Sequence, residues 1–331
     1  MGDEKMDTII INYLSKLEFG EPLHFKNMGV IPLFTSIDHS LEYLTLKEAL
    51  EKRLLTITEV SHGGSVPELK VTNKAEIPVL LLDGEELVGA KQNRTLNTSI
   101  LLKKKSETII PVSCTEQGRW SYVSEEFDEA DLIASPKLRA MKARSVTVSL
   151  EKAHEYMANQ AEIWDEIDEM SAHAEVRSPT GAMRDIFEDK MNSLNEYLKA
   201  FKYVPSQKGL LAIINGEVAG FDIISLESAY KILHPKLLKS YAMDALLQKE
   251  GKSGKLSVDK AKAFLKETAI CKENKYKSIG HGWDYRFEAK TIVGSALVYR
   301  KKVIHTTFFR TSESDKAGRM AGYRRRRDFR I

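Results

Sequence analysis

The chain has 331 residues, of which 42% are hydrophobic and 29% are charged. Such a composition is typical of globular proteins and excludes a chain that is disordered throughout. Its two cysteines cannot build a disulfide framework, which favours a reducing compartment. Residues 1–7 are charged rather than apolar, and the longest apolar runs fall far short of the ~18 residues that span a bilayer. We therefore expect a cytoplasmic protein of about two domains that does not enter a membrane.

The formal net charge of +3 is concentrated at the C-terminal end. Residues 316–331 carry +6, which leaves −3 for the rest of the chain. Four consecutive arginines lie in this tail, Arg324, Arg325, Arg326 and Arg327. They could bind nucleic-acid phosphates while neighbouring aromatic rings stack on bases. A tail that is disordered, or that docks on an acidic protein surface, is the alternative.

In the N-terminal part, apolar spacing predicts a helix over residues 7–17 and a short helix over 45–52. Between and after them, short strands are expected over residues 30–34, 54–60, 69–72, 79–82, 99–102 and 108–113. The strand over 54–60 alternates, with Leu55, Ile57 and Glu59 on one face. An antiparallel sheet or sandwich is the natural arrangement for these strands.

After Phe127 the pattern becomes helical. One long helix is expected over residues 150–167, a second over 183–201, and further helices over 228–248, broken near Pro235, and 258–268. Strands are expected over 210–224, 278–288, 294–299 and 302–309. The predicted class is α+β, with antiparallel β-rich N-terminal and C-terminal segments flanking a helical middle. We divide the chain into residues 1–126, 127–311 and a basic tail, 312–331.

Familiar catalytic and cofactor motifs are missing from the sequence. It contains no phosphate-binding glycine loop, no nucleophile elbow and no zinc-type histidine or cysteine spacing. The carboxylates of residues 162–169 fall on the polar side of a predicted helix, where we expect them to face solvent. The sequence thus predicts no metal site and does not indicate a cofactor.

The densest group of polar side chains lies in residues 89–97, with Lys91, Gln92, Asn93 and Arg94 in succession. Amides and a guanidinium suit phosphate, ribose hydroxyls or a base edge. If this run is a strand, Gln92 and Arg94 share one face and Asn93 lies on the other. The alternative is an edge strand whose amides cap neighbouring backbone.

A second candidate run, residues 110–120, carries Cys114, Glu116, Arg119 and Trp120. Arg119 could activate a Cys114 thiolate, although free cysteines are more often buried and inert. Glu116 and Arg119 form either a structural ion pair or a ligand clamp. Trp120 is either a stacking platform or, as is commoner for tryptophan, a core anchor.

Histidine supplies the remaining candidates. His305, in an apolar strand, could act as a general base, and Asp222 is a carboxylate that could reach the same cleft. A lone histidine in an apolar strand is nevertheless more often a hydrogen-bonded core residue.

The two polar runs resemble the ARPP-1 family, whose name stands for ADP-ribosylglycohydrolase and rhodanese-phosphatase-superfamily-associated protein. The similarity lies in residues 78–94 (PVLLLDGEELVGAKQNR) and 110–120 (IPVSCTEQGRW), and it extends over about residues 14–309. It implies a prokaryotic protein with a role in NAD and ADP-ribose metabolism. The matching motif positions are Gln92, Asn93, Arg94, Cys114, Glu116, Arg119 and Trp120.

Two functional hypotheses follow, and whether the protein is an enzyme is left open. In the first, the chain binds or hydrolyses an ADP-ribose-type nucleotide. Arg94 and Arg119 hold phosphates, Gln92 and Asn93 hold the ribose or base, and Trp120 completes the ligand site. Glu116 or His305 then transfers protons. In the second, the chain is a non-catalytic assembly or sensor module whose arginine-rich tail binds a protein partner or nucleic acid.

Overall fold

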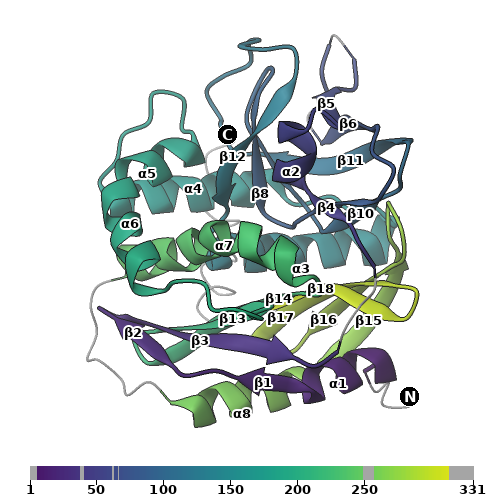
Figure 1. Ribbon diagram of the computed structural model, residues 1–331. Coiled ribbons are helices and arrows are strands. Elements are labelled where there is room, and N and C mark those ends of the chain that lie inside the picture. Colours follow the sequence, from purple (N-terminus) through teal and green to yellow (C-terminus); the bar gives the residue numbers. More distant parts are fainter. Residues whose placement is uncertain (1–5, 38–40, 62, 66, 249–256, 313–331) are drawn as a thin grey trace.

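The computed structural model describes residues 6–37, 41–61, 63–65, 67–248 and 257–312. Figure 1 shows a large sheet with helices on both of its faces, and a smaller β-unit beyond the helices of one face. The predicted α+β class with antiparallel sheets is confirmed.

The large sheet joins the two ends of the described chain. Its order is β1-β3-β13-β14-β18-β17-β16-β15, with β2 on β3. The strands span β1 Leu17–Phe19, β2 Leu23–Phe25, β3 Met28–Thr35, β13 Gly209–Ile214, β14 Glu217–Ile224, β15 Lys272–Lys277, β16 Trp283–Glu288, β17 Ile292–Tyr299 and β18 Lys302–Arg310. All neighbouring strands are antiparallel. Because β3 pairs with β13, the first strands of the chain lie beside strands from its second half.

The smaller β-unit is a six-stranded sheet that curls back on itself, and we call it the barrel. Its order is β12 (Phe127–Ile133), β8 (Glu85–Gly89), β9 (Arg94–Leu96), β11 (Ser106–Cys114), β6 (Glu68–Asn73) and β5 (Leu55–Glu59). A single antiparallel bridge between Thr58 and Glu126 brings the last strand back to the start of the first. Beside it, β4 (Leu44–Thr45), β7 (Val79–Leu81) and β10 (Ile100–Leu102) form a three-stranded sheet. A separate apolar core fills this unit.

Helices cover both faces of the large sheet (Figure 1). On one face lie α1 (Thr8–Ser15) and α8 (Val258–Thr268), and on the other α3 (Pro136–Ala153) and α7 (Glu227–Leu247). The layer is completed by α4 (Gln160–Ala174), α5 (Met183–Asp189) and α6 (Met191–Ala200). The short α2 (Leu46–Glu51) starts with a capping box in which the Thr45 hydroxyl and the Glu48 carboxylate each accept from the other residue's backbone N–H.

Several predicted elements need correction. The single helix over 150–167 is wrong: α3 ends where His154 adopts a left-handed φ of 57°, and α4 starts at its own cap, Asn159. The helix over 183–201 is divided at Lys190 into α5 and α6. Conversely, α7 runs through Pro235 without a break. The strand over 278–288 begins only at Trp283.

The chain segments that we separated in the sequence are interleaved in space. The barrel continues past residue 126 into β12, which pairs with β8. Residues 17–35 belong to the same sheet as the C-terminal strands. Of the basic tail, residues 313–331 lie outside the described residues, so the arginines 324–327 have no structural account.

One cluster of buried charged side chains connects the barrel, α3 and the large sheet, and we call it the central ionic cluster: Asp83, Arg139, Lys142, Asp222 and His305. Arg139 on α3 binds Asp222 on β14 through two hydrogen bonds of 2.7 and 3.0 Å. Arg139 and Lys142 also reach Asp83, in the turn between β7 and β8, at 3.2 and 3.1 Å. All five side chains are buried. The barrel is thereby tied through α3 to the large sheet.

Candidate functional site

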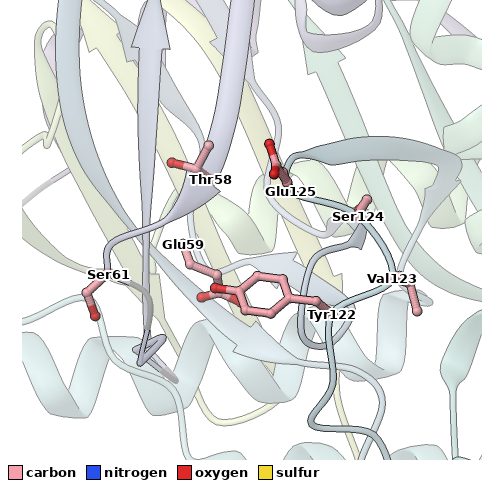
Figure 2. Close-up of a pocket in the computed structure, with 7 residues that line it drawn as sticks. All are labelled: Thr58, Glu59, Ser61, Tyr122, Val123, Ser124 and Glu125. Atoms are coloured by element: carbon pink, nitrogen blue, oxygen red, sulfur yellow. The ribbon is translucent and has the colours of Figure 1, made fainter.

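A pocket of about 670 Å³ opens at the seam where β5 returns to β12. Its lining comes from two segments, the end of β5 and the residues before β12: Thr58, Glu59, Ser61, Tyr122, Val123, Ser124 and Glu125. Figure 2 shows these side chains on the two facing segments. A volume of this size is typical of small-molecule sites.

Glu59 is the unusual residue of this pocket. On β5 it follows Leu55 and Ile57, which face the barrel core, so the alternation directs a carboxylate into the same interior. Its side chain is 3% exposed. Neither carboxylate oxygen has a hydrogen-bond partner among the described residues. A buried carboxylate without hydrogen bonds is costly and is rarely left so without a reason.

Arg94 lies behind Glu59 as the first residue of β9. Its Nη2 is 3.8 Å from Glu59 Oε1, which is an ion pair but too long for a hydrogen bond. Nη1 donates to the backbone and side-chain oxygens of Gln92 at 3.0 and 2.9 Å. Nε and Nη2 have no hydrogen-bond partner in the described part of the chain. Burial lowers the pKa of Arg94. The two buried charges thus face each other with unused hydrogen-bonding capacity.

Exposed aromatic rings stand beside this pair. Trp120 is 48% exposed and Tyr122 46%. The Lys91 ammonium lies 5.3 Å from the Trp120 ring and 5.1 Å from the Tyr122 ring. A methyl group at Gly64 would lie 3.3 Å from Trp120 and 3.5 Å from a Glu59 oxygen, so this ring and the carboxylate are close neighbours. Of the two sequence alternatives for Trp120, the core anchor is wrong.

The predicted residues Gln92, Asn93, Glu116 and Arg119 come together beside this pair. Arg119 Nη2 donates to Glu116 Oε2 at 2.6 Å and to Asn93 Oδ1 at 3.0 Å. The Asn93 backbone N–H donates to Glu116 Oε2, and Gln92 Nε2 donates to the Glu116 carbonyl. The strand that the sequence allowed over this run does not form: the chain turns from β8 into β9 over residues 90–93, and β9 begins at Arg94. The turn lets side chains converge that a strand would separate.

Glu116 is fully occupied by protein donors. Besides Arg119, the Thr180 hydroxyl donates to its Oε1 at 2.9 Å. Burial raises the pKa of Glu116, but the hydrogen bonds from Arg119, Thr180 and the Asn93 backbone outweigh it, so the pKa lies below its usual value. Such a carboxylate is well suited to hold the turn at 90–93 and is a weak proton acceptor. A catalytic role for Glu116 stays a prediction.

His305 lies apart from Glu116, in the central ionic cluster. It is completely buried on β18, with Nε2 3.1 Å from Asp222 Oδ1 and Nδ1 2.9 Å from Ser99 Oγ. Asp222 in turn is bound by Arg139 and by the Tyr241 hydroxyl. Its position fits the alternative stated for a lone histidine in an apolar strand. Proton transfer by His305 also stays a prediction.

Cys114 is buried on β11, directly opposite Arg94 on β9. Desolvation raises the pKa of its thiol to about 11, although Arg94 acts in the other direction. At neutral pH the group is therefore a thiol rather than a nucleophilic thiolate.

Sequence reasoning missed Glu59, Tyr122 and Thr180. For Glu59 a signal existed, because it is the one charged residue on the apolar face of an alternating strand. Thr180 had none, since it reaches Glu116 across 64 residues of sequence. Glu166, expected to face solvent with its neighbours in 162–169, is instead buried and paired with Lys137 at 3.1 Å.

Within the described residues, no group of three or more histidine, cysteine, aspartate or glutamate side chains could hold a metal ion. None of the helices in the described residues is both long enough and apolar enough to span a membrane.

Comparison with known proteins places the motif residues in a family. The family model of the ARG and Rhodanese-Phosphatase-superfamily-associated Protein domain, ARPP-1, matches residues 16–309. No curated protein and no solved structure matches the chain. The matched range contains the whole barrel, the helical layer and all but the last residue of the large sheet. The chain therefore belongs to the ARPP-1 family.

Proposed function

We propose that the protein binds an ADP-ribose-type nucleotide, derived from NAD, in the pocket beside Glu59. The observation that carries this proposal is the buried pair of Glu59 and Arg94 at the wall of a 670 Å³ pocket: both Glu59 oxygens and the Nε and Nη2 of Arg94 have no hydrogen-bond partner among the described residues. Trp120 and Tyr122 offer faces on which a base can stack. The family description, which refers to ADP-ribosylglycohydrolase, supports the same ligand class.

Binding is the core of the proposal, and hydrolysis is a second step that it allows. Hydrolysis needs a proton acceptor at the ligand. Glu116 is bound by Arg119 and Thr180, whereas neither oxygen of Glu59 has a hydrogen-bond partner within the described part of the chain. If the protein hydrolyses its ligand, Glu59 is the carboxylate we expect to act.

A thermal-shift screen of the full chain tests the proposal, with ADP-ribose, NAD, AMP and a short RNA as ligands. At about 100 times its dissociation constant, a ligand adds roughly 2.7 kcal/mol, which raises Tm by a few degrees. We expect this shift with ADP-ribose and a weaker one in Trp120→Ala, because a stacked base contributes ~1–3 kcal/mol. Trp283→Ala is the matched control, since Trp283 is similarly exposed on the large sheet.

No shift with any nucleotide, in protein that melts cooperatively, contradicts the proposal. It favours the non-catalytic module, whose partner would then be sought with the full chain and with a chain ending at residue 312. An RNA-specific shift that disappears on this truncation points to the tail instead.

A further inference from the structure

We propose that Glu59 recognises two neighbouring hydroxyl groups of the ligand, one at each carboxylate oxygen, as in the 2′,3′-diol of a ribose. This inference rests on the proposed nucleotide function and specifies which part of the ligand enters the pocket.

The first step concerns the hydrogen bonds of the Glu59 carboxylate. Glu59 is almost completely buried, lines the pocket, and has no hydrogen-bond donor on either oxygen among the described residues (Figure 2). Of the hydroxyl groups around it, Ser124 is already committed, because its Oγ donates to the Glu126 carbonyl at 2.7 Å. A ligand that supplies two donors would remove the cost of both unpaired oxygens at once.

The second step concerns charge. Arg94 lies 3.8 Å from Glu59 Oε1 and already balances the carboxylate, while the distance leaves the oxygen without a hydrogen bond. A cationic ligand would add a positive charge next to Arg94 and close to Lys91. The Glu59 carboxylate therefore needs hydrogen-bond donors that carry no charge. Two neighbouring hydroxyl groups of a ligand meet this need.

The third step gives the orientation of the ligand. Among the described residues, the pocket lining contains two carboxylates, Glu59 and Glu125, and no basic side chain. Phosphate groups are repelled there, whereas Lys91 stands outside the lining, between the Trp120 and Tyr122 rings. The sugar therefore enters the pocket, and the phosphates remain outside it, toward Lys91.

The experiment compares ADP-ribose with two analogues, each lacking the 2-hydroxyl of one of its riboses, by titration calorimetry on the full chain. We expect at least one analogue to bind 100-fold or more weakly, because a site built to accept a hydroxyl discriminates strongly against its loss. In Glu59→Gln, which keeps the side-chain shape, this ratio should fall below 10-fold. Glu107→Gln, an exposed carboxylate on the barrel strand β11 and not among the residues that line the pocket, is the matched control and should keep the full ratio.

The outcomes separate the two proposals. If both analogues bind within threefold of ADP-ribose to the parent protein, the diol inference is overturned while the nucleotide site stands. The diol inference is likewise overturned if Glu59→Gln retains the full discrimination. Should Glu59→Gln fail to fold, the ratio in the parent and in Glu107→Gln still decides. If none of the three ligands binds, both proposals are overturned.

Discussion

Glu86 on β8 is a completely buried carboxyl group whose neighbours leave one oxygen unused. The Thr115 hydroxyl donates to Oε1 at 2.5 Å, and Oε2 has no hydrogen-bond partner in the described part of the chain. Burial raises the pKa of Glu86 to about 8, although Thr115 acts in the opposite direction. At neutral pH the folded protein therefore holds a proton on this group.

This proton makes stability depend on pH. Between the ordinary glutamate pKa and about 8, the folded chain keeps the proton and the unfolded chain releases it. The free energy of unfolding is therefore largest at the acid end of this interval and falls as the pH rises through it. We expect Glu86→Gln, which cannot ionise, to lose less stability between pH 5 and 8, as measured by urea unfolding.

The quantity to compare is the difference in the free energy of unfolding between Glu86→Gln and the parent at each pH. Burial also raises the pKa of Glu166 to about 7 and that of Asp244 to about 6, and both groups add slopes of the same sign. Parallel stability curves for Glu86→Gln and the parent between pH 5 and 8 would show that Glu86 is ionised in the folded state.

At the residue scale, the sequence showed which side chains could contribute to a site. It did not show which of them keep hydrogen-bonding groups that the protein itself does not use. Gln92, Asn93, Arg94, Glu116 and Arg119 were all recognisable as candidates. Which of them keeps unused donors or acceptors depends on partners that are distant in sequence. Arg94, for example, faces Glu59 from another strand, and no local pattern contains that pairing.

At the scale of elements, β15 is the outer strand of the large sheet, next to β16. In its sequence, KENKYK, the three lysines are exposed and the residues between them are partly buried. Lys275 and Lys277 both lie about 5 Å from the Trp283 ring. Charged side chains on an outer strand hinder pairing with a strand of another molecule.

Replacing Lys275 and Lys277 together by threonine should promote self-association through this edge. Threonine favours strands, and the change removes both charges from the outer strand of the sheet. We expect a concentration-dependent increase in mass by light scattering at tens of micromolar protein. The control is Lys104→Thr with Lys105→Thr, which makes the same charge change in the loop between β10 and β11. Equal masses for both double variants would contradict this role of the lysines.

Hydrophobic periodicity located most elements and failed at their interruptions. The apolar spacing from Leu150 to Ile167 continues across the gap between α3 and α4, so a periodic pattern alone cannot reveal the left-handed turn at His154. Pro235 misled in the opposite direction, because α7 is buried along most of its length and tertiary packing outweighs the lost backbone hydrogen bond. Strand β15 was missed because its polar sequence has no apolar face.

At the scale of the molecule, the central ionic cluster connects the barrel, the helical layer and the large sheet. Burial raises the pKa of Asp222, but Arg139 and His305 more than compensate, and the pKa lies well below its usual value. The carboxylate is therefore ionised in the folded protein and is matched by a guanidinium that has no access to water.

We expect Asp222→Asn to destabilise the protein by roughly 3–5 kcal/mol, because it leaves the buried Arg139 without its main counter-charge. Chemical unfolding at neutral pH measures this change. The control is Glu196→Gln, which breaks an exposed pair with Lys26 and should cost less than about 1 kcal/mol. If Asp222→Asn lowers the free energy of unfolding no more than the control does, the central ionic cluster does not hold the barrel, α3 and the large sheet together.

The topology of the large sheet also constrains the order in which the protein can be assembled during synthesis. The barrel strands all lie between Leu55 and Ile133, so this unit can close early. β3 ends at Thr35, yet its neighbour β13 starts only at Gly209. β18, which pairs with β14, is made later still and starts at Lys302. At ordinary translation rates the delay is on the order of ten seconds. The first strands to leave the ribosome are thus among the last to be covered, and in that interval they depend on chaperones or on one another.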